Sequence, residues 1–180
     1  MRRQVWERED DGRINMKKSD IKTNAMRLLE QKKIPFTVHD YADTGVVSGM
    51  EVAKVLGEDP DMVFKTLVTV GKSGEHYVFV VPVNKELDLK KAAQAAGEKS
   101  ISMIKSKELL DLTGYIHGGC SPVGMKKFFK TFVDKSAEKL ETIMVSGGKI
   151  GCQIEIAPGE LAKVIRLTFA DISETVNGEI

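Results

Sequence analysis

The sequence predicts an α+β fold in which peripheral helices surround a curved, mixed β-sheet. The first observation is a pair of apolar, β-branched runs at residues 64–70 and 76–83, separated by Gly-Lys-Ser-Gly. This pattern is typical of a hairpin and indicates two central strands. The second is another hairpin pattern around Gly147-Gly148, and the third is the helical periodicity that returns between strands, as at residues 89–96. Strands that are mostly linked by hairpins, with helices between some of them, favour the α+β class.

The N-terminal half of the chain contains clear start and stop signals for helices. Ser19 can cap a first helix, whose apolar residues recur at helical spacing and which must end before Pro35. A strand is expected at residues 36–41. Ser48 begins a capping-box pattern, which predicts a second helix that ends at Gly57.

The rest of the chain gives signals of the same kinds. Asp88 is placed to cap an alanine-rich helix that Gly97 ends, and Pro158 suits the first turn of the last helix. The elements expected after the central hairpin are a helix at 89–96, a strand at 100–104, a helix at 106–112, strands at 130–134, 142–146 and 151–156, a helix at 158–165 and a closing segment at 167–172.

A chain of 180 residues is long enough for one self-sufficient domain. A folded body of this mass buries roughly 70% of the surface of its extended chain, so it needs no disulfide bridges. Residues 1–15 hold four arginines and four acidic residues, with no period that would bury Val5 and Trp6, whereas Met16 opens a conventional start. We expect residues 1–15 to be a disordered or non-native appendage and residues 16–180 to form a single domain.

Composition narrows the classes of function. The 27 basic and 26 acidic residues leave a net charge of +1, which argues against a protein that binds DNA through many phosphates. No apolar run approaches the ~18 to 20 residues of a membrane span. Cys120 and Cys152 lack zinc-binding spacing and are too few for a disulfide framework. We therefore expect a cytoplasmic protein that uses no metal, cofactor or membrane.

Lys65 is the most unusual residue of the central strands. It lies within Phe-Lys-Thr-Leu-Val-Thr-Val, where the neighbouring residues favour burial, and a buried lysine is costly unless an anionic group meets it. One interpretation is an edge-strand lysine that points to solvent and blocks aggregation. The other is a cationic anchor for a phosphate or for a polarised carbonyl.

The loop at residues 118–124, Gly-Gly-Cys-Ser-Pro-Val-Gly, offers backbone N–H groups without large side chains, which suits an oxyanion or an extended small ligand. A plain turn between strands is the alternative. Cys120 follows His117 by three residues, but these positions project to different faces, and a free cysteine is more often a small buried hydrophobe than a nucleophile. A basic run after the loop is a solvated face or a guide for a single-stranded RNA end. Its members are Lys126, Lys127, Lys130 and Lys135.

Several short motifs, in order and at similar spacing, resemble the YbaK/EbsC family of free-standing aminoacyl-tRNA deacylases, relatives of the editing domain inserted in bacterial prolyl-tRNA synthetases. The resemblance runs from about residue 19 to residue 172. The motifs are Thr-Asn-Ala-Met-Arg-Leu-Leu at 23–29, Val-Phe-Lys-Thr-Leu at 63–67, Leu-Asp-Leu-Lys-Lys at 87–91, the glycine loop at 118–124, Val-Ser-Gly-Gly-Lys at 145–149 and Glu-Leu-Ala-Lys at 160–163.

The resemblance implies the family's α+β fold, the hydrolysis of a mischarged aminoacyl-tRNA, most readily cysteine on the proline tRNA, and two catalytic positions. Lys65 matches the family's essential lysine. Gly118 and Pro122 match its G-x-x-x-P loop, which holds the aminoacyl 3′ end of the tRNA together with the intervening Gly119, Cys120 and Ser121.

The resemblance also implies further substrate-binding residues. Tyr41 matches a pocket tyrosine and Ser146 a polar residue of the second glycine turn. Two positions depart from the pattern: Gln153 stands where some relatives have aspartate, and residues 42–48 form a shorter segment without their pocket aromatic. Both departures concern amino-acid selectivity more than the class of reaction.

The chemistry needs no nucleophile from the protein. An aminoacyl ester is already activated, so fixing its carbonyl and stabilising the developing oxyanion can suffice. A cysteinyl ester can also be attacked by its own thiol. The near-neutral charge suggests that this domain does not read tRNA identity deeply, and the resemblance implies prolyl-tRNA synthetase as a partner that delivers the tRNA. Two alternatives remain open: a deacylase for alanyl- or seryl-tRNA, and a non-catalytic module of the same fold that binds a tRNA end or a synthetase.

Overall fold

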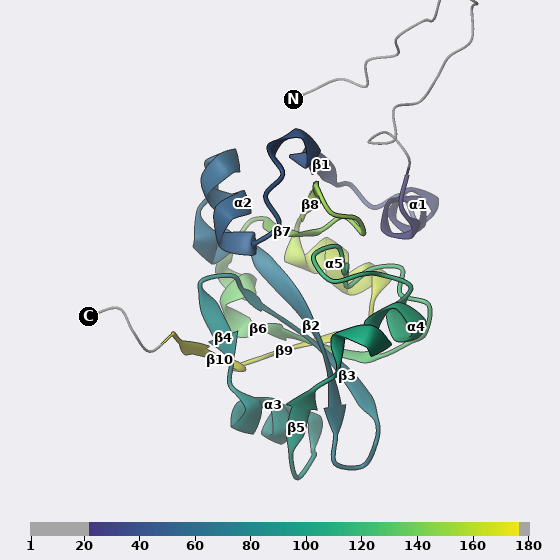
Figure 1. Cartoon of the computed structure of the whole chain (residues 1–180), viewed down its shortest axis with the longest axis vertical. Coiled ribbons are helices and arrows are strands. Elements are labelled where there is room, and N and C mark those ends of the chain that lie inside the picture. Colours follow the sequence, from purple (N-terminus) through teal and green to yellow (C-terminus); the bar gives the residue numbers. More distant parts are fainter. Residues whose placement is uncertain (1–21, 177–180) are drawn as a thin grey trace, which may run out of the picture.

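The computed structural model describes residues 22–176 (Figure 1). The appendage predicted at residues 1–15 and the cap predicted at Ser19 lie outside this range. The described part has the predicted α+β architecture, but its strands are divided among three sheets. None of the helices in residues 22–176 combines the length and apolar character that a membrane crossing requires.

The largest sheet has five strands and mixed direction. Its central hairpin, β2 with β3, lies between antiparallel β5 on one side and parallel β6 and β9 on the other. In spatial order the strands are β5 (Ile101–Met103), β2 (Phe64–Gly71), β3 (His76–Pro82), β6 (Lys130–Asp134) and β9 (Leu167–Ala170).

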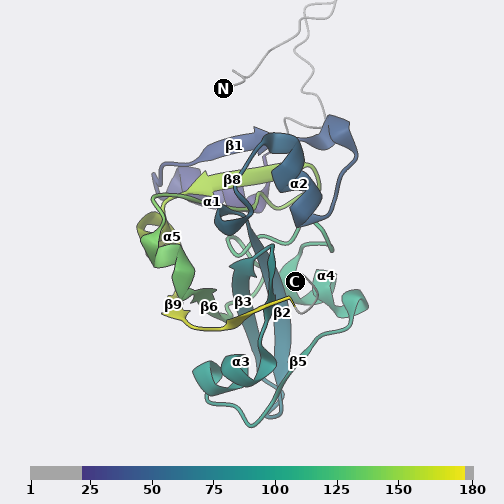
Figure 2. The same cartoon turned by 90° about the vertical axis from the view of Figure 1, so that its left-hand side faces the viewer.

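A second, three-stranded antiparallel sheet lies across one end of this hairpin (Figure 2). Its order is β1 (Thr37–Asp40), β8 (Cys152–Ile156) and β7 (Ile143–Ser146). A single bridge between Val63 and Met144 connects it to the start of β2. The third sheet pairs β4 (Lys85–Leu87) with β10 (Ser173–Thr175). These last two strands were not predicted, because Lys-Glu-Leu and Ser-Glu-Thr are mostly polar and lack the apolar, β-branched run that indicates a strand.

The helices match the predicted positions closely. They are α1 (Asn24–Gln31), α2 (Gly49–Leu56), α3 (Leu89–Ala96), α4 (Leu109–Thr113) and α5 (Pro158–Val164), with short 3-10 turns at Ala42–Thr44, Pro60–Met62, Ser106–Glu108 and Lys135–Lys139.

Two details of the helix caps differ from the prediction. The N-cap of α1 is Thr23, whose hydroxyl accepts from the Met26 N–H and also donates to the Gly147 carbonyl. Ser48 has the extended backbone of an N-cap, but its side chain makes no capping hydrogen bond. Asp88 caps α3 as predicted, accepting from the N–H groups of Lys90 and Lys91.

The core follows from the alternation of side chains along β3. Successive residues of a strand point to opposite faces, so Val78 and Val80 belong to one apolar cluster and Phe79 and Val81 to another. All four are fully buried. The hairpin is therefore buried on both faces, and only an edge of it remains available for a site.

Candidate active site

The first half of β2 has an open edge. Among the described residues, β2 pairs with β5 only from Thr69 onward, and the bridge to β7 stops at Val63. The Val83 N–H donates to the Val63 carbonyl on the β3 side at 2.8 Å. Since backbone groups alternate in direction along an antiparallel strand, those of Phe64 and Thr66 point to the open edge.

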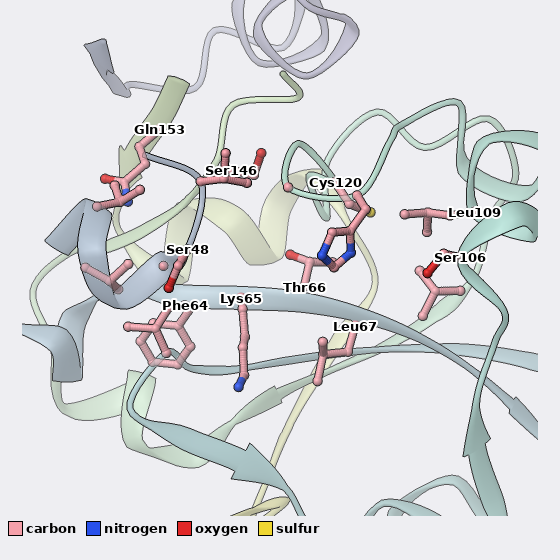
Figure 3. Close-up of a pocket in the computed structure, with 18 of the residues that line it drawn as sticks. Ser48, Phe64, Lys65, Thr66, Leu67, Ser106, Leu109, Cys120, Ser146 and Gln153 are labelled. Carbon is pink, nitrogen blue, oxygen red and sulfur yellow. The ribbon is translucent and has the colours of Figure 1, made fainter. Parts of the chain in front are cut away.

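A cavity of about 620 Å³ lies along this edge. Its walls come from segments that are far apart in the chain: the start of α2, the first half of β2, the stretch from β5 to α4, the first glycine loop, and the facing ends of β7 and β8 (Figure 3). The tertiary structure therefore brings most of the predicted site together. The predicted residues that line the cavity are Tyr41, Lys65, Gly118, Cys120, Ser146 and Gln153.

Three predicted residues of the glycine loop do not line the cavity. Gly119 packs against the second glycine turn, because a Cβ there would lie 2.9 Å from the Ile150 backbone nitrogen. Ser121 is fully buried and its hydroxyl accepts from the Val123 N–H at 3.2 Å. Pro122 is buried beside it. These residues shape the loop from behind, which is not the substrate contact expected from the sequence.

Gly118 stands at the junction of three segments. Its φ of +84° favours glycine, and a Cβ would lie 2.7 Å from Cγ1 of Val47 and 3.5 Å from Cγ1 of Ile150. The segment before α2 therefore closes directly over the glycine loop. An added methyl group would displace Val47 or the loop.

Lys65 is half-buried and lies on the opposite side of β2 from Thr66. Its amino group points away from Ser146 and Gln153 (Figure 3). Burial lowers the pKa of Lys65 from its ordinary value, and the nearby Glu86 partly opposes this shift. The lysine is thus a partly desolvated cation at one side of the cavity.

Thr66 was missed by sequence reasoning. It lines the cavity, and its hydroxyl oxygen is buried without a hydrogen-bond partner among the described residues. Buried hydroxyls are normally paired, so this one is available to a ligand. In the sequence it is simply one β-branched residue of an apolar strand, which carries no such signal.

The cysteines are not poised for nucleophilic attack. Cys120 is 8% exposed, and burial raises the pKa of its thiol to about 11. Burial likewise raises the pKa of Cys152 to about 11. Since the thiolate is the nucleophilic form, both thiols are poorly suited to the nucleophile role at neutral pH.

The polar end of the cavity is built on the three-stranded sheet. Gln153 of β8 pairs in register with His39 of β1 and with Ser146 of β7, so the three side chains form a row on one face. Ser146 accepts from the Gly148 N–H at 3.2 Å. Tyr41, two residues beyond His39, is buried, and burial raises the pKa of its hydroxyl.

Glu58, just after α2, is the second residue that sequence reasoning missed. When the Gln153 amide is assigned in the orientation that its neighbours satisfy, its nitrogen donates to the two carboxylate oxygens of Glu58 at 3.1 and 3.0 Å. Burial raises the pKa of Glu58 and nearby Glu155 adds to this, while His39 and the Gln153 hydrogen bond oppose it. His39 Nε2 lies 3.1 Å from Glu155 Oε2. No sequence spacing could connect Glu58 to Gln153, because they meet only where the segment after α2 lies beside β8 in the folded chain.

Two further predictions concern metals and RNA. Within residues 22–176, no group of three His, Cys, Asp or Glu side chains is arranged to hold a metal ion. The predicted basic run lies outside the cavity lining. Next to it, Phe128 is 66% exposed, and the Arg166 guanidinium lies 5.9 Å from its ring centre.

The fold and the cavity define a class of protein, and comparison with known proteins establishes it: the chain belongs to the aminoacyl-tRNA editing domain family, whose sequence profile matches residues 45–164. A relative in Enterococcus faecalis, named "Putative Cys-tRNA(Pro)/Cys-tRNA(Cys) deacylase EbsC", is 46% identical over 158 residues, covering 87% of this chain and 96% of the relative.

Two further comparisons agree with this family. The chain is 33% identical over 100 residues to a proline–tRNA ligase of Thermosipho melanesiensis, covering 55% of this chain and 17% of the ligase. A solved structure described as "a putative trans-editing enzyme for prolyl tRNA synthetase" superposes with a TM-score of 0.76 at 26% identity, covering 84% of this chain and 95% of that one. The predicted family and fold class are confirmed.

Proposed function

We propose that the protein is a trans-editing deacylase that removes cysteine from mischarged tRNA, chiefly Cys-tRNA(Pro), by positioning the ester without a protein nucleophile. The observation that carries the proposal is the cavity that joins Gly118, Lys65 and Gln153 in a chain of the editing-domain family. The name of the Enterococcus faecalis relative supports cysteine as the amino acid and the proline tRNA as the carrier.

The proposed chemistry uses the substrate's own thiol. Its sulfur attacks the ester carbonyl, a carbon–sulfur bond forms, and the carbon–oxygen bond to the ribose breaks. The ribose oxygen leaves with a proton, and a cyclic thioester is released, which water then opens. A thiol of pKa ~8.5 is a few per cent ionised at neutral pH, whereas a hydroxyl is almost fully protonated. The burial of Cys120 and Cys152 supports attack by the substrate thiol rather than by a thiol of the protein.

The residues of the cavity are assigned roles on this basis. The backbone at Gly118 binds the carbonyl oxygen as negative charge develops on it. Ser146, Tyr41 and Gln153 surround the aminoacyl group. Lys65 points away from this end, so its cation is better placed for a phosphate of the terminal nucleotide than for the carbonyl. Prolyl-tRNA synthetase is the proposed source of the tRNA.

The test is single-turnover deacylation of cysteinyl- and seryl-tRNA made on the same tRNA, at saturating protein, which removes binding differences from the comparison. Thiol-assisted release predicts that the cysteinyl ester is cleaved at least about 100-fold faster, because the serine hydroxyl supplies almost no anion. Equal rates would instead indicate attack by water. A wider panel of charged tRNAs separates the alternatives, since no turnover on any of them would leave only a binding module.

A further inference from the structure

The Gln153 side chain is held in one orientation at the wall of the cavity. It is 5% exposed, and its amide nitrogen donates to both oxygens of Glu58. A carboxylate accepts hydrogen bonds and cannot donate them. Glu58 therefore fixes the amide nitrogen on its own side, which leaves the amide oxygen of Gln153, a residue of the cavity wall, available to another partner.

Both partners of this contact are anchored to rigid elements. Gln153 is in the central strand of its sheet, with β1 on one side and β7 on the other. Glu58 follows the left-handed Gly57 at the end of α2, and its N–H donates to the Ala53 carbonyl at 2.8 Å. A polar group held this way needs little reorganisation when a ligand arrives.

The charges around this end of the cavity favour a cation. Glu155 and His39 act on Glu58, and Asp40 and Lys149 act on Cys152, the neighbour of Gln153, so acidic groups outnumber basic ones here. His39 is hydrogen-bonded to Glu155, at 3.1 Å, and Thr142 also donates to Glu155, at 3.2 Å. The hydrogen bonds to Glu58 polarise the Gln153 amide. Its oxygen therefore becomes a stronger acceptor for a cationic ligand.

We propose that Gln153 and Glu58 form a subsite for the α-ammonium group of the esterified amino acid, in which the Gln153 oxygen accepts its hydrogen bond and Glu58 is the positioning residue. This inference rests on the proposed function. The ammonium is the one cation of an aminoacyl ester and lies one carbon from the reacting carbonyl. Binding it at this end orients the carbonyl, and it excludes esters whose amino group is acylated, such as those of peptidyl-tRNA.

The experiment measures binding with a probe that cannot be deacylated, 3′-cysteinylamino-3′-deoxyadenosine, in free-amine and N-acetyl forms. The ratio of their dissociation constants gives the preference for the ammonium group. We expect wild type to prefer the free amine at least about 10-fold, roughly one charge-assisted hydrogen bond. Glu58→Ala should reduce the preference to within about 2-fold. Glu58→Gln, whose amide oxygen can still accept from Gln153, should give an intermediate ratio.

Glu155→Gln is the matched control. It removes a carboxylate from the same face of β8 without touching the Gln153 amide, so the preference should stay within about 2-fold of wild type. The proposal is overturned if wild type binds both probes equally, or if both Glu58 variants retain the full preference. A loss of preference in Glu155→Gln equal to that in Glu58→Ala would also overturn it, by showing a general charge effect. Because the probe is not cleaved, absence of deacylation alongside a retained preference would refute only the proposed function.

Discussion

The two halves of β2 differ in how completely the fold encloses them. Thr69, in the second half, lies between β3 and β5; it is fully buried and its hydroxyl donates to the Tyr77 carbonyl at 3.0 Å. Thr66, in the first half, lies at the open edge, and its buried hydroxyl has no partner among the described residues. The same residue type is thus satisfied by the fold where the strand is enclosed and left for a ligand where it is not.

The largest effect is expected from removing a core side chain beside the enclosed second half of β2. Phe132 of β6 stacks on Phe79, with ring centres 5.3 Å apart, and also contacts Tyr77. We expect Phe132→Ala to lower the free energy of unfolding by about 3–5 kcal/mol, because a large buried ring leaves a cavity. Denaturant titration measures this change. The deacylation rate per folded molecule should stay within about 3-fold of wild type, and a selective loss of activity would contradict the separation of the two halves.

The open half should respond in the opposite way. We expect Lys65→Ala to lower kcat/KM for deacylation by at least about 100-fold, or ~2.7 kcal/mol, because the variant removes a desolvated cation proposed to bind the substrate. Its unfolding free energy should change by less than about 0.5 kcal/mol, since Lys65 has no ion-pair partner within 4 Å among the described residues. Activity retained within a few-fold would remove Lys65 from the site.

The two threonines give the most closely matched comparison. Thr69→Val should lower the free energy of unfolding by about 1–2 kcal/mol, because the Tyr77 carbonyl loses a buried donor. Thr66→Val should leave stability unchanged or raise it slightly, because no hydrogen bond is lost. Deacylation should show the reverse, with a reduction of about 5- to 10-fold for Thr66→Val only. The comparison fails if both variants affect the same property.

The smallest effect is expected at Cys120. Cys120→Ala should keep the deacylation rate within about 3-fold, and the rate should still rise with pH up to the substrate thiol's ordinary pKa of ~8.5. Complete loss of activity with normal folding would restore the nucleophile hypothesis.

The Cys120 thiol also makes the stability of the folded protein depend on pH. Burial raises its pKa to about 11 in the folded state, so its contribution is present below the unfolded value of ~8.5 and is lost as pH rises from there toward 11. Wild type should lose more stability over that range than Cys120→Ala, which thermal unfolding at several pH values would show.

The sequence by itself determined most of the local structure and the membership in a family. Asp88 and Gly97 bound α3 as predicted, and the β2–β3 hairpin forms at its glycine turn. Motif resemblance predicted Lys65 and Gly118 as site residues, and both line the cavity. These features depend on residues close together in the chain, where capping, turn chemistry and periodicity leave a readable pattern.

The tertiary structure decided how those pieces are joined. It divides the strands among three sheets, turns Lys65 and Thr66 to opposite sides of one strand, and packs Gly119 and Ser121 behind the loop rather than into the cavity. It also brings Glu58 to Gln153, a contact that no local pattern encodes. Strand register and the position of the segment after α2 set these relations, and both depend on burial across the whole fold rather than on neighbouring residues.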